Sequence, residues 1–401
     1  MFAENMVELG QKRSTIREIF EYGKKRAAEV GAENVYDFSI GNPSVPAPDC
    51  VRTAVINVLD QEGPVAAHSY TSAQGDLGVR TAMADDLNRR FGTHFHAYNF
   101  YMTVGAAAAL SSCFKALAEP GDEFIAIAPF FPEYQCFVER GAGARLVAVE
   151  ADTDAFQINF DKLSEAITPH TKAVIINSPN NPSGTVYSEK TIKTLAALLT
   201  EKSAALDHPI FLISDEPYRE LVYGGVQTPF VTKYYNNTFV CYSYSKSLSL
   251  PGERIGYVLV PDELEDSRTA YAAICGAGRS LGYVNAPSLF QRVAAACAGQ
   301  TADLAVYEKN RDLLYEGLLR LGFSCVKPEG AFYIFPRSLE PDAAAFCARA
   351  RKYDLLLVPG DDFGCPGHVR ISYCVPTERI TKAMELFEKL AAEYRQARSA
   401  E

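Results

Sequence analysis

Short apolar runs alternate with helical patterns through the middle of the chain, from about residue 100 to residue 260. Continuous apolar runs separated by helices indicate strands that are buried on both faces of a mostly parallel sheet. One of the intervening helices is predicted at Glu189–Leu206. The predicted strands lie in EFIAIAPF, ARLVAVE, KAVIINSP, IFLISDEPY, TFVCYSYSK and IGYVLVP.

The pattern changes near residue 301, where a second, smaller α+β unit is expected to begin. LAVYEKNRDLLYEGLLRLGF predicts a long amphipathic helix, GAFYIFPRS and HVRISYCV predict strands, and TERITKAMELFEKLAAEYRQA predicts a closing helix. The first forty or so residues end in the turn IGNPSVPAP and are expected to pack with this unit. We therefore predict a large domain at residues 43–300 and a small domain made of residues 1–42 and 301–401.

Composition is that of an ordinary globular protein, and its charge limits the possible partners. The 401 residues suggest two domains, with 48% hydrophobic and 22% charged residues. The net charge of −10 argues against general affinity for nucleic acid or for an anionic membrane. The N-terminal stretch has no apolar core typical of a signal peptide, and residues 97–114 contain polar residues and a glycine, which predict a strand, turn and helix rather than a membrane span.

Cysteine and histidine usage points to a cytoplasmic protein without a metal site. The ten cysteines form no C-x-x-C pair and are scattered along apolar segments, so we expect reduced thiols in the core. The six histidines are isolated, and no metal-ligand spacing is present.

Polar residues follow several of the predicted strands, where ligands gather in an α/β sheet. Asn181, Asp215, Tyr218 and Lys246 each come shortly after an apolar run, and Gly105 precedes a helix start built from small residues. Each residue alone has a simpler explanation, since an Asp often caps a helix, Asn-Pro often forms a turn and a lysine is usually solvated. Their joint occurrence favours one shared site.

The same residues fit an aromatic aldehyde cofactor that carries a phosphate. The Lys246 amine can form a Schiff base, and the Asp215 carboxylate can keep a pyridine nitrogen protonated. The amide of Asn181 and the phenol of Tyr218 can form hydrogen bonds with the ring hydroxyl. Free N–H groups at the helix start after Gly105 can hold the phosphate, and Arg254 adds a cation suited to phosphate geometry.

Seven motifs occur in an order that resembles the fold-type I pyridoxal-phosphate enzymes, specifically the class I/II aminotransferases similar to aspartate aminotransferase. The resemblance extends from Ile40 to Tyr373. It implies an α/β fold, with a mostly parallel large sheet of the seven-stranded type and a smaller α+β domain built from both termini. The motifs are YTSAQGDLGVR, TVGAAAAL, APFFPEY, NSPNNPSG, SDEPY, SYSKSLSLPGERIGY and VRISY.

The resemblance also implies a role for each matched position. Lys246 would form the Schiff base with pyridoxal 5′-phosphate, and Asp215 would face the pyridine nitrogen. Asn181 and Tyr218 would bond the ring oxygen, and Phe131 would stack on the ring. The phosphate would be held by the following residues: Gly105, Ala106, Ala107, Ser243, Ser245, Arg254 and, from a second subunit of a homodimer, Tyr70.

The implied reaction is a ping-pong transfer of an amino group from an L-amino acid to a 2-oxo acid. Arg370 would grip the substrate α-carboxylate near Gly41 and Asn181. Arg279 would read a second carboxylate in the neighbouring subunit's pocket, although a structural ion pair or a phosphate-side contact explains it equally well. Aspartate or a related small or dicarboxylic amino acid is therefore the expected donor.

Two other functions stay open at this point. The same cofactor motifs also support elimination chemistry, either β-elimination by a C–S lyase or the α,γ-elimination of aminocyclopropane-carboxylate synthesis. A ligand-sensing regulator could also keep the scaffold without catalysis. Such regulators usually add a DNA-binding module, and only about forty residues precede the core motifs here.

Overall fold

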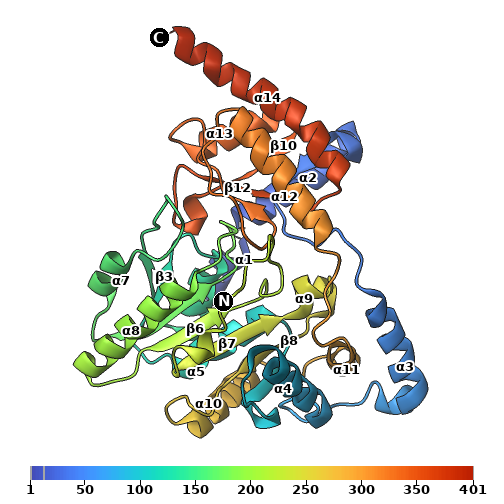
Figure 1. Ribbon diagram of the computed structural model, residues 1–401, viewed down its shortest axis with the longest axis vertical. Coiled ribbons are helices and arrows are strands. Elements are labelled where there is room, and N and C mark those ends of the chain that lie inside the picture. The colour runs from blue at the N-terminus through green and yellow to red at the C-terminus, as the bar shows by residue number, and fades with distance from the viewer. Residues whose placement is uncertain (1, 12–13, 401) are drawn as a thin grey trace.

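The computed structural model describes residues 2–11 and 14–400, and its centre is a seven-stranded sheet (Figure 1). The strand order is β2-β8-β7-β6-β5-β3-β4. All neighbouring pairs are parallel except those of β8, which runs antiparallel to both β2 and β7. The strands are β2 (Phe100–Thr103), β3 (Glu123–Ile127), β4 (Arg145–Val149), β5 (Thr171–Asn177), β6 (Phe211–Asp215), β7 (Thr238–Ser243) and β8 (Gly256–Leu259).

Helices cover both faces of this sheet. The α-helices are α1 (Glu4–Gln11), α2 (Thr15–Val30), α3 (Asp49–Ala66), α4 (Leu77–Phe91), α5 (Ala106–Leu117), α6 (Glu133–Gln135), α7 (Phe160–Ala166), α8 (Glu189–Leu206), α9 (Tyr244–Ser247), α10 (Ser267–Ser280), α11 (Ser288–Ala296), α12 (Ala305–Arg320), α13 (Ala343–Ala350) and α14 (Thr377–Ala400). Among these described helices, none is long and apolar enough to cross a membrane.

Alternate residues of one strand enter different cores, which explains the continuous apolar runs. In β5, Ala173 and Ile175 pack in the cluster that contains α5 and α10. Val174 and Ile176 pack on the other face, with Leu195 of α8. Because successive side chains of a strand point to opposite faces, a strand covered by helices on both sides must be apolar at every position.

The predicted α/β fold is therefore confirmed, and the helix expected at Glu189–Leu206 has those bounds. Its first turn is capped by Ser188, whose hydroxyl accepts a hydrogen bond of 3.0 Å from the N–H of Thr191. The strand expected in GAFYIFPRS is shorter than predicted and covers only Tyr333–Ile334 as β9. Beyond β9 the pairing becomes irregular: Pro336, which has no N–H to donate, accepts a hydrogen bond of 2.9 Å from the N–H of Val369, and Arg337 forms an isolated bridge with His368.

The segment that follows α1 and the C-terminal part of the chain together form a smaller α+β unit, which we call the terminal unit (Figure 1). Strand β1 (Tyr36–Asp37) pairs in parallel with β10 (Leu355–Leu356), and a three-stranded antiparallel sheet has the order β11-β12-β9. The remaining strands are β11 (Val358–Pro359) and β12 (Val369–Ser372). We propose residues 1–42 and 301–401 as its extent, with 43–300 as the large domain; residues 1, 12, 13 and 401 lie outside the described residues.

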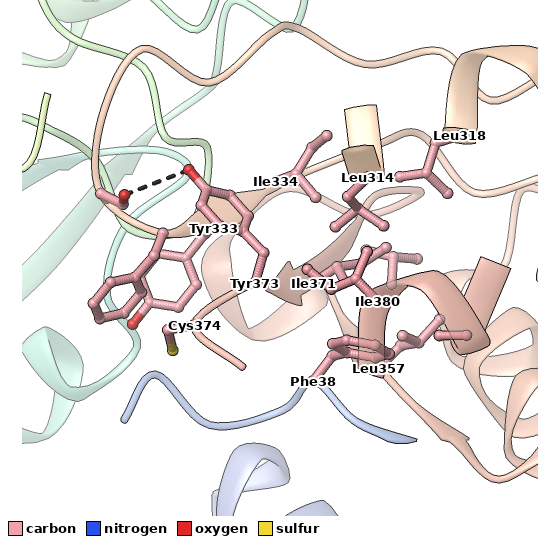
Figure 2. Close-up of a cluster of buried hydrophobic side chains, with 14 of the residues drawn as sticks. Phe38, Leu314, Leu318, Tyr333, Ile334, Leu357, Ile371, Tyr373, Cys374 and Ile380 are labelled. Carbon is pink, nitrogen blue, oxygen red and sulfur yellow. Dashed lines mark hydrogen bonds between the residues drawn. The ribbon is translucent and has the colours of Figure 1, made fainter. Parts of the chain in front are cut away.

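The core of the terminal unit extends to the large sheet. Phe38 packs with Leu314 of α12 and Ile371 of β12 in one buried cluster, and Figure 2 shows Phe38 beside Leu357. Tyr218 and Leu221, which follow β6, belong to the same cluster. This shared core joins the terminal unit to the carboxyl ends of the parallel strands.

Candidate active site

The carboxyl ends of β5, β6 and β7 lie side by side and bring together the segments that contain Asn181, Asp215 and Lys246. Asn177 and Asp215 are opposite each other in the β5–β6 register, and Asp215 is opposite Cys241 of β7. The side chain of Asn177 donates a hydrogen bond of 2.8 Å to the carbonyl of Asp215 and accepts one of 2.7 Å from the N–H of Asn181. One amide thus fixes the two strand ends relative to each other.

Lys246 lies one helical turn beyond β7, in the short helix α9 rather than at the strand end itself. Its Nζ donates a 2.6 Å hydrogen bond to the carbonyl of Gly41 and lies 5.4 Å from the ring centre of Phe332. Burial, as the largest cause, and the cations Arg254 and Arg370 together lower the pKa of Lys246 to about 8, although Cys374 acts in the opposite direction. A neutral, nucleophilic amine is therefore accessible near physiological pH.

Asp215 is buried and has one partnered and one unpartnered oxygen. Oδ2 accepts a 2.5 Å hydrogen bond from the hydroxyl of Tyr134, whereas Oδ1 has no partner among the described residues. Burial raises the pKa of Asp215 to about 7, although the bond from Tyr134 acts in the opposite direction. An orphaned carboxylate oxygen in a dry site fits the protonated ring nitrogen of a pyridine cofactor.

The start of α5 forms a pocket edge suited to a phosphate. Gly105 precedes the helix with φ of 85°, and a Cβ at this position would lie 2.9 Å from Nη2 of Arg254. A Cβ on Gly256, which pairs with Ser243, would lie 3.2 Å from the Gly105 backbone. The hydroxyls of Ser243 and Ser245 are 2.7 Å apart. A helix N-terminus, two hydroxyls and a guanidinium therefore lie together, as a bound phosphate requires.

Arg370 comes from β12 of the terminal unit and reaches the same site. Its Nη1 donates a 3.0 Å hydrogen bond to Oδ1 of Asn181, and Nη2 donates to the carbonyl of Ser39. The guanidinium lies 4.8 Å from the ring centre of Tyr333, and Nε has no partner within the described part of the chain. A buried guanidinium with unused donor capacity fits a carboxylate ligand.

Two tyrosines link the cofactor side of the site to the terminal unit. The hydroxyls of Tyr218 and Tyr333 are 3.0 Å apart. Gly41 passes so close to Tyr333 that a Cβ on Gly41 would overlap its hydroxyl. Glycine is therefore required where the chain passes this ring.

Three residues of the site were not predicted from the sequence: Tyr134, Tyr333 and Ser39. Tyr134 is in APFFPEY, three positions after Phe131, and this helical spacing could have placed it near the ring-stacking residue. The rings of Phe131 and Tyr134 are indeed edge to face at 5.7 Å. Tyr333 and Ser39 contribute through tertiary contacts with distant segments, and nothing in their local sequence distinguishes them.

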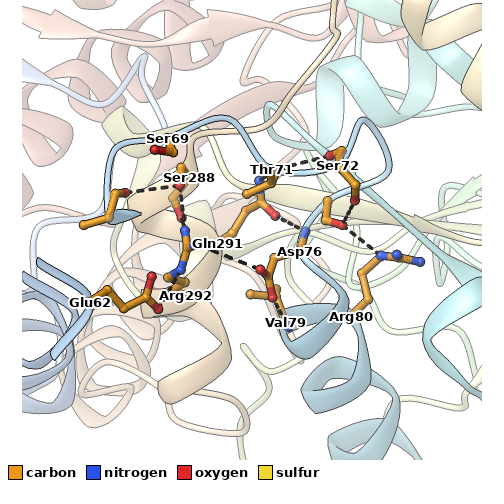
Figure 3. A network of polar contacts seen from close by, with 12 residues as sticks. Glu62, Ser69, Thr71, Ser72, Asp76, Val79, Arg80, Ser288, Gln291 and Arg292 are labelled. Atoms are coloured by element: carbon orange, nitrogen blue, oxygen red, sulfur yellow. Dashed lines mark hydrogen bonds and ion pairs between the residues drawn. The ribbon is translucent and has the colours of Figure 1, made fainter. Parts of the chain in front are cut away.

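Two predicted residues point away from this cluster. Tyr70 is 95% exposed, and Arg279 is exposed at the end of α10. The loop that contains Tyr70 is nevertheless held by a network of polar contacts, and Figure 3 shows its neighbours Thr71, Ser72 and Asp76 in that network. The side chain of Asn285 donates a hydrogen bond of 2.9 Å to the carbonyl of Thr71. The buried Gln291 accepts one of 2.8 Å from the N–H of Asp76. A rigid loop that presents an exposed tyrosine agrees with a role outside its own subunit, which stays a prediction.

One cysteine, Cys374, lies near Lys246 and Arg370 and acts to raise the pKa of Lys246. All ten cysteines are free thiols, and the closest recorded pair is Cys113 and Cys241, with sulfurs 3.6 Å apart in the core. Over residues 2–11 and 14–400, no group of three His, Cys, Asp or Glu side chains could hold a metal ion.

A largely enclosed amine, a carboxylate with a free oxygen, a helix start suited to a phosphate and a buried guanidinium are the groups that a pyridoxal-phosphate site on an α/β sheet requires. The family model described as aminotransferase class I and II matches residues 33–387. The chain belongs to this family, so it is an aminotransferase and its cofactor is pyridoxal 5′-phosphate.

Known relatives and solved structures agree. The chain is 32% identical to an aspartate/prephenate aminotransferase of Thermus thermophilus, over 87% of this chain and 89% of that protein. It is 30% identical to an aspartate aminotransferase of Geobacillus stearothermophilus, over 90% and 92%. An amino transferase of Eubacterium rectale is 62% identical, with a TM-score of 0.96 over 98% of this chain and 99% of that one. The Thermus thermophilus aspartate aminotransferase with maleate is 28% identical, with a TM-score of 0.85 over 97% and 99%.

The depressed pKa of Lys246 predicts a pH-dependent cost to stability in the cofactor-free protein. Below about pH 8 the folded chain must enclose a charged amine, at a cost of at most about 3 kcal/mol, and this cost disappears as pH rises to the ordinary lysine pKa of 10.5. The free energy of unfolding of the unchanged protein should therefore rise relative to that of Lys246→Met between pH 8 and 10.5. Urea unfolding at several pH values measures this slope.

Lys190→Met is the control, because Lys190 is exposed on α8. Its stability gap should not vary with pH. A flat gap for Lys246→Met would show that the amine is not desolvated.

Proposed function

We propose that the enzyme moves an amino group from a small or dicarboxylic L-amino acid, with aspartate as the best candidate, to a 2-oxo acid in a ping-pong cycle. The observation that carries this proposal is the enclosed Lys246 amine, which has a pKa of about 8 and shares one site with Arg370 and the free oxygen of Asp215. The match to aspartate/prephenate aminotransferases supports the substrate class, and one structural relative was solved with the dicarboxylate maleate.

Pyridoxal phosphate supplies, when bound, an aldehyde that condenses with amines and a protonated ring that withdraws electrons from the substrate Cα. Lys246 provides the amine that would hold the cofactor at rest. With a substrate amine in its place, the free Nζ would act as a general base on the substrate Cα proton and would then return a proton. Its lowered pKa suits both steps, because an amine that titrates near the working pH can accept and release a proton readily.

The other residues orient the two ligands. Asp215 would accept the ring N–H at Oδ1, and Asn181 and Tyr218 would bond the ring oxygen. Arg370 would grip the substrate α-carboxylate beside Gly41, whose backbone lies directly against Tyr333. Phe131 would cover the ring face. The phosphate would be held by Gly105, Ala106, Ala107, Ser243, Ser245 and Arg254.

A homodimer in the cytoplasm is part of the proposal. Large apolar side chains are exposed on α3 and the segments near it: Ile56, Leu59, Val65, Tyr70 and Val284. Helix α3 packs on α11, whose Gln291 supports the Tyr70 loop, so these side chains belong to connected elements. Apolar patches of this kind mark protein interfaces. A second copy on this face would receive Tyr70 at its phosphate site.

The reaction type is tested by separating amino transfer from elimination. With aspartate and 2-oxoglutarate the enzyme should form glutamate, and Lys246→Ala should lower kcat by at least about 100-fold, because general acid–base catalysis contributes that much. With cysteine conjugates and no acceptor, little pyruvate or thiol should accumulate. Coupled assays of glutamate, pyruvate and thiol measure all three products.

Sustained release of pyruvate and thiol without an acceptor would identify a C–S lyase instead. Full activity of Lys246→Ala would contradict the assignment of the lysine.

If Arg279 determines which substrate the enzyme selects, its replacement should impair only substrates with a second carboxylate. If this exposed guanidinium binds the distal carboxylate in a neighbouring subunit, Arg279→Ala should raise KM for aspartate about tenfold or more and leave alanine turnover unchanged. Steady-state kinetics with aspartate, alanine and an aromatic amino acid measure the difference.

Arg268→Ala is the matched control, because Arg268 is exposed at the start of the same helix, α10. It should leave all three substrates unaffected. An equal loss of activity on all three substrates in Arg279→Ala would contradict the specificity role.

Sharing of sites between subunits predicts complementation. A hybrid dimer of a Lys246→Ala subunit and a Tyr70→Ala subunit should contain one intact site, because the intact Lys246 of one subunit meets the intact Tyr70 of the other. Mixed and refolded subunits should therefore be more active than either variant alone. Absence of any gain in a hybrid shown to be dimeric would place Tyr70 outside its partner's site.

A further inference from the structure

Tyr134 makes a single, short hydrogen bond in an otherwise apolar environment. Its side chain is 1% exposed, and its ring lies among those of Phe114, Phe130 and Phe131, with ring centres 5.7 to 6.5 Å apart. The hydroxyl donates to Oδ2 of Asp215 at 2.5 Å. A buried phenol needs a partner, and the chain provides one on the residue that faces the cofactor ring.

This bond divides the Asp215 carboxylate into two unlike oxygens. Oδ2 is taken by the phenol, and Oδ1 has no partner among the described residues. The terminal torsion of an aspartate is soft, so a carboxylate with no hydrogen bonds has no fixed plane. The phenol therefore sets the rotation of the carboxylate and leaves Oδ1 as the acceptor for a ligand.

The phenol also favours the ionised carboxylate. Burial and the carboxylate of Glu216 both raise the pKa of Asp215, and the hydrogen bond from Tyr134 opposes them. Tyr134 itself cannot become an anion near neutral pH, because burial and the adjacent Asp215 raise its pKa well above the ordinary value. It is thus a permanent donor, whereas Tyr218, Cys241 and Glu216 around Asp215 do not donate to the carboxylate in the structure.

We propose that Tyr134 is a positioning residue for pyridoxal phosphate: it holds the Asp215 carboxylate ionised and oriented so that Oδ1 accepts the ring N–H. The proton would stay on the ring nitrogen, with Oδ1 as its hydrogen-bond acceptor, and no covalent bond would change. This inference rests on the proposed role of Asp215. It assigns to the FPEY segment a function in electron withdrawal by the cofactor, in addition to its packing.

The experiment compares two cofactors in equilibrium binding to cofactor-free enzyme. One is pyridoxal phosphate, and the other is its analogue with carbon in place of the ring nitrogen. Tyr134→Phe removes only the hydroxyl and should weaken binding of pyridoxal phosphate about tenfold, since one charge-assisted hydrogen bond then no longer organises Asp215. Binding of the analogue should be unchanged, because it has no ring N–H for Oδ1 to accept.

Tyr235→Phe is the matched control. Tyr235 is also buried and donates 2.6 Å to the carbonyl of Ile210, on the far side of the sheet from α5. This variant should bind both cofactors as the unchanged enzyme does. Thermal melting of the three proteins checks that each is folded.

Two results overturn the inference in distinguishable ways. If Tyr134→Phe weakens both cofactors equally, or neither, the tyrosine is only a packing residue. If Asp215→Ala binds pyridoxal phosphate as tightly as the unchanged enzyme, the proposed role of Asp215 fails as well. Loss of affinity in Asp215→Ala together with no loss in Tyr134→Phe rejects the inference and leaves the proposed site intact.

Discussion

Three ionisable side chains are enclosed in one site of the described chain without an ion-pair partner, and the packing of both parts of the fold holds them there. Lys246, Asp215 and Arg370 form no ion pair among the described residues, and Asp215 and Arg370 each retain an unpartnered polar atom. Burial of an uncompensated charge is costly. Burial therefore favours the neutral forms: it is the largest cause that lowers the pKa of Lys246 to about 8 and raises that of Asp215 to about 7. In the proposed function, a protonated cofactor ring and a substrate carboxylate would supply ion-pair partners for Asp215 and Arg370.

A neighbouring buried charge shows the contrasting, structural solution. Arg219 directly follows Tyr218, and its Nε lies 2.5 Å from Oε2 of Glu216. Its guanidinium also lies 4.5 Å from the ring centre of Tyr242 and donates to the hydroxyl of Tyr257. Glu216 in turn accepts 2.6 Å from Ser214. These charges form an ion pair within the chain and hold the segment beyond β6, although Nη2 of Arg219 has no partner among the described residues. Lys246, Asp215 and Arg370 differ in that none of them forms such an ion pair with another described residue.

The site is divided between two parts of the fold. The atoms suited to the cofactor come from the ends of β5, β6 and β7 and from the start of α5. Those suited to the substrate carboxylate come from β12, with Tyr333 of β9 beside them. Tyr218 belongs to the buried cluster of the terminal unit and bonds Tyr333, so packing of that unit also sets the position of a cofactor-side phenol.

The sequence alone determined the succession of strands and helices along the chain and the candidate residues that follow the strands. Apolar runs reveal strands because a strand covered on both faces must be apolar throughout, and polar residues after them reveal ligand positions because parallel strands end at one edge. It could not reveal Tyr333, nor which oxygen of Asp215 is free. The tertiary structure decided these features, because hydrogen bonds between residues 81 and 115 positions apart depend on how distant segments pack, and no local pattern records that.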